Sequence, residues 1–245
     1  MGTILFLKLN MSKQKYFFLS IFFFVVGLIL HYLPKYDYFL LDFFNSNFYN
    51  EEFFQYFTEI GNGYIVAGFV IPLLSYASYR LKALNFVPLS ALIFPTIYLG
   101  IINGILKREI FSFERPGFYR FENIEYLEPV FKYGSFPSGH AATIFVVIFI
   151  WLGLAVKKGY QYKFYLHGSL IALASLVALS RVIVGAHWFS DILASLGIAL
   201  LFRFLVEFNF FYNHIAKTEV LKYLAYLVVV IAWINILFFD VSKYF

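Results

Sequence analysis

Apolar residues gather in seven long segments that polar stretches separate. A helix that spans a lipid bilayer needs about 20 mostly apolar residues. The seven segments come close to that length and lie at 16–33, 64–79, 84–106, 140–156, 164–184, 188–205 and 220–239. The pattern therefore predicts an all-α, polytopic bundle of membrane helices. We expect the short second and fourth segments to tilt or to extend into their flanks.

The composition supports a membrane protein. The chain has 245 residues, of which 62% are hydrophobic and 13% are charged. Soluble domains are about 45–50% apolar and ~25% charged, and disordered chains are poorer still in apolar residues, so both classes are excluded. The chain has no cysteine, which excludes disulfides, thiolate metal sites and a cysteine nucleophile. No repeat or linker divides it, so we expect one domain over residues 1–245.

Two segments leave alternatives open. Segment 37–60 is aromatic and acidic, and it fits either an interfacial helix on the outer surface or a loop in the aromatic belt. The seventh apolar segment lies within a C-terminal addition, 206–245, that follows a polar stretch. It predicts an extra helix that is either transmembrane or interfacial.

The basic residues predict an orientation. The net charge is +5, but the positive charges are scattered between apolar segments, which favours a role in membrane topology over nucleic-acid binding. With the N-terminus in the cytoplasm, most of the 19 lysines and arginines fall on the inner side. The outer segment 34–63 holds only Lys35 among several acidic residues. This agrees with the positive-inside rule and predicts a multi-pass protein of a plasma membrane, such as the bacterial inner membrane.

A few basic residues break that rule. Five lie between the third and fourth segments, and one lies near the outer end of the fifth; they are Lys107, Arg108, Arg115, Arg120, Lys132 and Arg181. Positive charge on the outer side needs a cause, and the binding of an anionic group supplies one.

Three polar clusters stand at the ends of the predicted spans. Because the spans alternate in direction, all three clusters should meet on one face of the membrane. They consist of Lys107, Arg108, Arg115 and Pro116 after the third span, of Pro137, Ser138, Gly139 and His140 at the start of the fourth, and of Ser180, Arg181, His187 and Asp191 between the fifth and sixth.

The residue types in these clusters fit phosphoryl transfer. Arginine matches phosphate oxygens with its planar fork, and a helix start near Gly139 aims free N–H groups at an anion. His187 and Asp191 are four residues apart, so on a helix they share a face. The carboxylate can then fix the imidazole tautomer and leave the other ring nitrogen as a nucleophile. His140 is the complementary general acid.

The motifs resemble those of a known family. FPSGH at 136–140 and SRVIVGAHWFSD at 180–191 resemble the second and third signatures of the type 2 phosphatidic acid phosphatase (PAP2) superfamily, and Arg115–Pro116 looks like the close of the first. The signature region is 107–191. The family places a lysine seven positions before that arginine, where this chain has Arg108, with Lys107 one residue further back. Either Arg108 replaces the lysine or Lys107 reaches in, and the "LK" context favours Lys107.

The resemblance implies a six-helix membrane core, to which the seventh segment is an addition, and a phosphohistidine mechanism. His187 would attack phosphorus, Asp191 would orient it, and His140 would protonate the leaving group. The residues implied in phosphate binding are Arg115, Arg181, Ser138, Gly139 and Lys107 or Arg108. The resemblance implies no metal and no cofactor. The expected partner is a phosphorylated membrane lipid of the phosphatidic acid, phosphatidylglycerophosphate, undecaprenyl pyrophosphate or lipid A class, met on the periplasmic or outer side.

Three other functions compete with a lipid phosphatase. A lipid phosphotransferase would use the same intermediate and pass the phosphoryl group to another acceptor. A vanadate-dependent haloperoxidase shares the signatures, but the apolar segments argue against that soluble class. A non-catalytic lipid-binding protein or transporter would place charge along the middle of its spans, whereas here the charge lies at one end.

Overall fold

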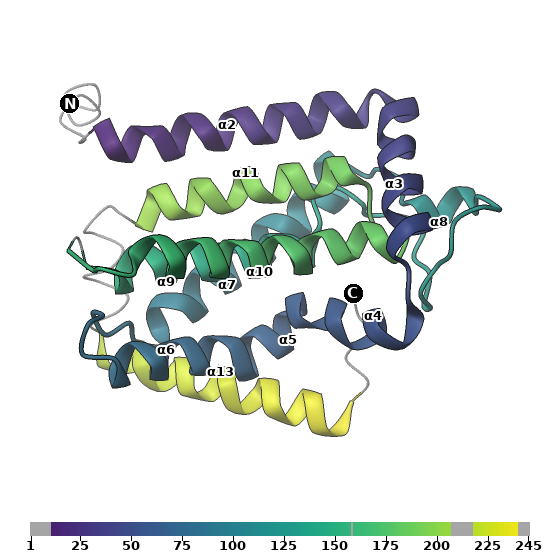
Figure 1. The fold of residues 1–245 in the computed structure, drawn as a ribbon. Helices are drawn as coiled ribbons and strands as arrows, with labels where there is room; N and C mark the ends of the chain where they lie inside the picture. The colour runs from purple at the N-terminus through teal and green to yellow at the C-terminus, as the bar shows by residue number, and fades with distance from the viewer. Residues whose placement is uncertain (1–10, 158, 207–217, 240–245) are drawn as a thin grey trace.

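The seven apolar segments all form helices in the computed structural model, which describes residues 11–157, 159–206 and 218–239 (Figure 1). The corresponding helices are α2 (Met11–His31), α5 (Gly63–Ile65) continued through the π-helical turn η2 (Val66–Val70) into α6 (Ile71–Arg80), α7 (Ser90–Ile105) with its π-helical extension η3 (Leu106–Ile110), α9 (Gly139–Ala155), α10 (Lys163–Ile183), α11 (Phe189–Val206) and α13 (Glu219–Phe238). These ranges hold no β-strand, so the all-α prediction is confirmed.

Length and composition qualify five of these helices to cross a bilayer, namely α2, α7 with η3, α10, α11 and α13. A sixth span arises if Glu51–Gly61 and Gly63–Arg80, bent by 61° at Asn62, count as one. The bend has a local cause, because the Asn62 side chain accepts a hydrogen bond from the Tyr64 N–H at 3.0 Å and so begins a new helix. The remaining apolar helix, α9, has only 17 residues.

Helix α9 forms the centre of the bundle. Most of its side chains are buried, as expected for a helix that is apolar on all sides. The Trp151 indole N–H donates a 2.8 Å hydrogen bond to the Leu74 carbonyl and ties α9 to α6. In the spans of α2 and α13 only 11% of residues are buried, against 72% in α11, so α2 and α13 lie at the periphery.

Helices α2 and α11 pack backbone against backbone. A Cβ atom added at Gly27 would lie 2.8 Å from the Ala194 nitrogen, and one added at Gly197 would lie 2.7 Å from the Phe24 nitrogen. Small residues permit this approach, which is typical of helix contacts within membranes. Helix α2 therefore holds α11, the helix that begins beside His187.

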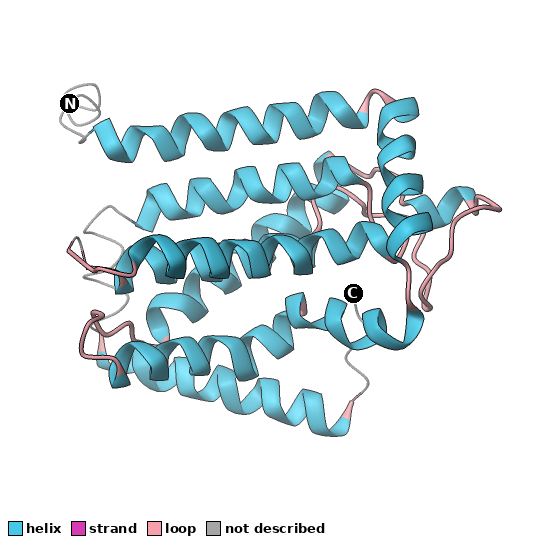
Figure 2. Cartoon of the chain, in the orientation of Figure 1, coloured by secondary structure: helices cyan, strands magenta, loops and turns pink. Residues whose placement is uncertain are grey.

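Loops and short helices close the two ends of the bundle (Figure 2). Segment 37–60 is helical, in α3 (Pro34–Phe48) and α4 (Glu51–Phe57), followed by the 3₁₀ turn η1 (Thr58–Gly61), so the helical alternative is the correct one. Helix α3 runs across the ends of the long helices (Figure 1). Its Asn45 amide donates to the carbonyls of Glu125 and Ile183, at 2.8 and 2.6 Å, and so joins α3 to the loop before α9 and to the end of α10.

The C-terminal helix α13 packs against α5, η2 and α7, and its length and composition agree with the transmembrane alternative. A Cβ atom added at Gly68 would lie 3.0 Å from Cδ1 of Ile236, and the rings of Phe69 and Trp233 are centred 4.3 Å apart. These contacts attach α13 to η2, next to the polar end of the bundle.

Candidate active site

His187 and Asp191 form a buried pair at the start of α11. His187 Nδ1 donates to Asp191 Oδ2 at 2.9 Å, and both side chains are almost completely buried. The same carboxylate oxygen accepts from the Trp188 N–H at 3.0 Å and from the Ser135 hydroxyl at 2.5 Å. Burial, followed by the nearby charge of Arg115, lowers the pKa of His187 well below its usual value. The imidazole is therefore neutral near pH 7, with Nε2 as its free nitrogen.

The turn that positions His187 requires a glycine. Gly185, between α10 and α11, has φ +68°, and a Cβ atom there would lie 2.8 Å from the Tyr126 ring. Beyond this turn the His187 N–H donates to the Arg181 carbonyl at 3.0 Å. The turn thus connects the last basic residue of α10 to the histidine.

The variant Gly185→Ala should lower the free energy of unfolding by roughly 2–3 kcal/mol, because it combines left-handed backbone strain with a clash against Tyr126. Denaturant unfolding in detergent measures this loss. Gly134→Ala is the matched control, since Gly134 has φ +69° but open space around its Cβ position. The control should lose only the backbone part, about 1–2 kcal/mol. Equal losses in the two variants would show that the Tyr126 contact is unimportant.

His140 lies in the first turn of α9 and is 4% exposed. Its Nε2 atom is 3.7 Å from Glu59 Oε1, and the other oxygen of Glu59 accepts from the Asn62 amide at 2.7 Å. A Cβ atom added at Gly61 would lie 2.9 Å from the Cβ of His140. The bent segment before α5 therefore packs directly against this histidine and brings a carboxylate to it.

Two buried arginines present unused donors. Arg115 uses Nε and Nη2 on the carbonyls of Tyr133 and Gly134, at 3.0 and 3.3 Å, and its Nη1 has no partner among the described residues. Arg181 donates from Nη1 to the Thr58 hydroxyl at 2.9 Å, and within the same described ranges its Nε is unpaired. Burial lowers the pKa of Arg115 to about 10, so its guanidinium stays charged at neutral pH. Unsatisfied buried donors of this kind fit an anionic ligand.

The remaining predicted phosphate-binding residues differ in their exposure and in their contacts. Lys107, on η3, interacts electrostatically with Arg115, Arg181 and Asp191, whereas Arg108 is exposed. Both line the same cavity. Ser138 is fully buried and caps α9 through a 3.5 Å hydrogen bond from the Ala141 N–H, so its hydroxyl faces its own helix.

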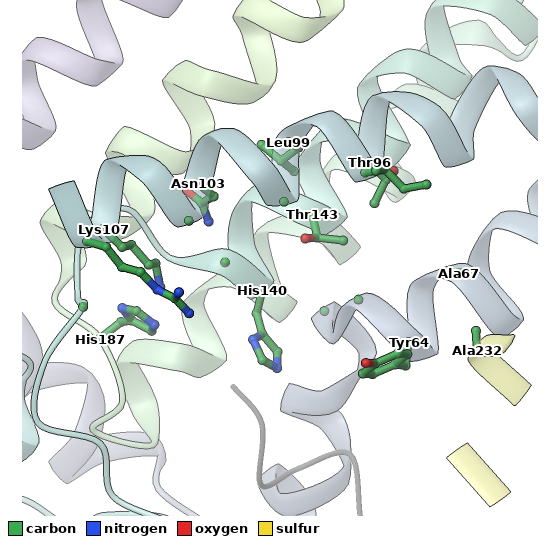
Figure 3. Close-up of a pocket in the computed structure, with 18 of the residues that line it drawn as sticks. Tyr64, Ala67, Thr96, Leu99, Asn103, Lys107, His140, Thr143, His187 and Ala232 are labelled. Atoms are coloured by element: carbon green, nitrogen blue, oxygen red, sulfur yellow. The ribbon is translucent and has the colours of Figure 1, made fainter. Parts of the chain in front are cut away.

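A cavity of about 600 Å³ extends from the site between α7, η2 and α13 (Figure 3). Lys107, Arg108, Arg115, Gly139, His140 and His187 line its polar end. Thr96, Ala67 and Ala232 lie toward the other end. Arg181, Ser138 and Asp191 do not line it directly. The arrangement suits a ligand with a phosphate at one end and an apolar part at the other.

Sequence reasoning missed four polar residues that support the site, because their partners are distant in the chain. Thr58 binds Arg181, Glu59 lies beside His140, and Ser135 binds Asp191. Asp37 of α3 accepts hydrogen bonds from the backbone N–H of Ser190, at 3.1 Å, and from its hydroxyl. Burial raises the pKa of Asp37 to about 6. It caps the start of α11 from the first outer helix.

No group of three or more histidine, aspartate and glutamate side chains in residues 11–157, 159–206 and 218–239 is arranged to hold a metal ion. The expectation that no metal or cofactor takes part stays a prediction.

A family model described as the PAP2 superfamily matches residues 88–216, more than half of the chain. The chain belongs to the PAP2 superfamily. Membership makes it a phosphatase, a hydrolase, and with its apolar helices it is an integral membrane protein of the lipid phosphatase class.

Two solved structures share the PAP2 fold. The crystal structure of the first transmembrane PAP2-type phosphatidylglycerolphosphate phosphatase from Bacillus subtilis has a TM-score of 0.62 and 20% identity, and the match covers 82% of this chain and 97% of that one. The crystal structure of Aquifex aeolicus LpxE has a TM-score of 0.53 and 22% identity, with coverage of 69% and 92%. A search of curated proteins finds no match.

Proposed function

We propose that this PAP2 protein hydrolyses a phosphomonoester or pyrophosphate on a membrane lipid headgroup through a phosphohistidine intermediate. The observation that carries the proposal is the cavity, at whose polar end two histidines and three cations meet and whose other end is apolar. Each histidine lies beside a different carboxylate, Asp191 for His187 and Glu59 for His140. Two such environments suit one nucleophile and one proton donor.

In the first step, His187 Nε2 attacks phosphorus and the bond between phosphorus and the lipid oxygen breaks. His140 gives its proton to that oxygen, and the lipid leaves as an alcohol or as a lipid monophosphate. Asp191 accepts from Nδ1–H throughout and stabilises the positive charge that develops on the ring. In the second step, His140 takes a proton from water, the resulting hydroxide attacks phosphorus, and the P–N bond breaks to release inorganic phosphate.

The free donors of Arg115 and Arg181 serve the phosphate oxygens in this mechanism, with the Gly139 N–H at the start of α9 and the Lys107 ammonium. Between the two basic residues that end the third span, the half-buried Lys107, which lies near Arg115 and Arg181, is favoured over the exposed Arg108. Ser138 acts by fixing the start of α9, so its part in phosphate binding is indirect.

We further propose that the site faces the outer, periplasm-like side of a plasma membrane. The N-terminal end of α2 and the site lie at opposite ends of the bundle (Figure 1). The basic residues near the N-terminus and in the loops at that end favour the cytoplasm for it.

The decisive experiment measures inorganic phosphate released by the purified protein from four lipids in mixed micelles. These are phosphatidic acid, phosphatidylglycerophosphate, undecaprenyl pyrophosphate and lipid A. We expect release from at least one of them, and the ranking of kcat/KM values identifies the headgroup. No release from any of the four would contradict the proposal.

The pH dependence of the reaction should be bell-shaped. Protonation removes the nucleophile, and because burial and Arg115 lower the pKa of His187, the acid limb of kcat/KM should lie below pH 6.5. The alkaline limb reports loss of the proton that His140 donates. Arg115→Gln removes a positive charge near His187 and should therefore move the acid limb to higher pH. A flat profile between pH 5 and 8, with chemistry rate-limiting, would contradict the two roles.

A further inference from the structure

Both glycines of helix α7 line the cavity. Thr96, Gly100 and Gly104 line it at intervals of four, so they share one face of the helix that leads to Lys107. A Cβ atom added at Gly100 or at Gly104 would meet no atom within 4 Å. The space in front of this face is therefore open and continuous with the polar end.

A buried amide marks the boundary between the polar and apolar parts. Asn103 lines the cavity one turn before Lys107, and its side chain is 6% exposed. Its Oδ1 atom accepts no hydrogen bond from the described part of the chain. A buried acceptor of this kind is costly unless a ligand or water supplies a donor, such as a headgroup hydroxyl.

Helix α13 forms the opposite wall. Val228, Ile231 and Ala232 line the cavity across from α7. The helix is held there by the contacts of Ile236 with Gly68 and of Trp233 with Phe69. Its residues follow the part of the chain that matches the PAP2 family model, 88–216, so the family match assigns them no role.

We propose that α13 is part of the substrate site and closes the side of a subsite for the hydrocarbon chain next to the scissile phosphate. The proposal rests on the proposed function, since it takes the polar end as the phosphate site. The occupant follows from the cavity itself, which is cationic at Lys107 and Arg115, offers a hydrogen-bond acceptor at Asn103, and is apolar between α7 and α13. Its volume, about 600 Å³, lies within the usual range of ligand sites.

The variant Gly100→Leu tests the subsite by filling it. Leucine favours the helix more than glycine and meets open space, so the fold should persist. We expect kcat/KM for dioleoyl phosphatidic acid to fall about thirtyfold, the effect of displacing two or three buried methylene groups, while kcat/KM for soluble dibutyryl phosphatidic acid is unchanged. Gly168→Leu is the matched control, because Gly168 of α10 also has open space but lies outside the cavity. It should change neither value.

Equal losses on both substrates, or no loss on the long-chain lipid, would overturn the proposal. Val228→Trp approaches the same space from α13 and should repeat the selective loss. Val230→Trp, on an exposed position of the same helix outside the cavity, should not.

A binding experiment separates failure of this proposal from failure of the proposed function. The chain has no cysteine, so Val228→Cys introduces its only thiol. In a His187→Ala background, which cannot turn the lipid over, dioleoyl phosphatidic acid should slow the reaction of this thiol with a small thiosulfonate reagent. It should not slow the reaction at Val230→Cys. Protection at both positions or at neither would overturn the subsite, whatever the catalytic activity of the wild-type protein.

Discussion

His187→Ala is expected to abolish phosphate release and to lower kcat by at least about 10⁴-fold, the scale seen when an enzymatic nucleophile is removed. The reason is geometric, because the Nδ1 atom of His187 is held by a buried carboxylate and the residue lines the cavity. The measurement is phosphate release at saturating lipid. A phosphoenzyme is detected by comparing samples quenched in alkali with samples quenched in acid. The wild-type protein should accumulate an acid-labile phosphoprotein, and the variant should not.

His167→Ala is the matched control for this result. His167 lies on an exposed part of α10 and contacts only the Lys163 carbonyl of its own helix, 2.8 Å from Nδ1, among the hydrogen bonds of the described residues. It should keep wild-type turnover. A folded His187→Ala protein that retains wild-type turnover would show that the nucleophile is misassigned.

Asp191→Asn is expected to lower kcat by about 10³- to 10⁴-fold while the fold persists. An asparagine has the shape of aspartate, so its oxygen can still accept from Ser135 and from the Trp188 N–H. It carries no charge, however, and cannot stabilise the imidazolium that forms when His187 attacks. In the flipped amide, the NH₂ group faces His187 instead, which holds the wrong tautomer of the ring and gives up those two hydrogen bonds. The measurement is single-turnover chemistry together with the unfolding midpoint in detergent.

Ser135→Ala provides the comparison for Asp191→Asn. It removes one hydrogen bond to the carboxylate and leaves the charge, so we expect a loss of only about tenfold, in line with one charge-assisted hydrogen bond. If Asp191→Asn lost no more than Ser135→Ala, the charge of Asp191 would have no special role in the reaction.

The sequence predicts the helices well because hydropathy reports burial in lipid directly. All seven apolar segments are helical, and α9, interpreted as a short span, is a short helix at the centre of the bundle. The pairing of His187 with Asp191 could be predicted from their spacing of four residues, although His187 lies in the turn before α11 and only Asp191 lies in its first turn. The bend at Asn62 could not, since it depends on one side-chain cap within an otherwise apolar region.

The supporting residues were missed for a different reason. Asp37 contacts Ser190, and Thr58 contacts Arg181, across more than 120 residues of sequence. Neither Asp37 nor Thr58 belongs to a sequence motif. Glu59 is one of several acidic residues in an outer segment. Only the packing of α3 and η1 against the ends of α10 and α11 identifies them. The same holds for the wall that α13 contributes, because hydropathy predicts a helix but not its neighbours.

The close contact between α2 and α11 has a consequence for biosynthesis. Gly27 emerges from the ribosome early, but its neighbour Ala194 is made about 170 residues later. At ordinary rates of translation this interval is on the order of ten seconds. During this interval α2 lies in the membrane without α11. Lipid then contacts the face of α2 that α11 later covers. The site beside His187 therefore cannot form before α11 has been made and has packed against α2.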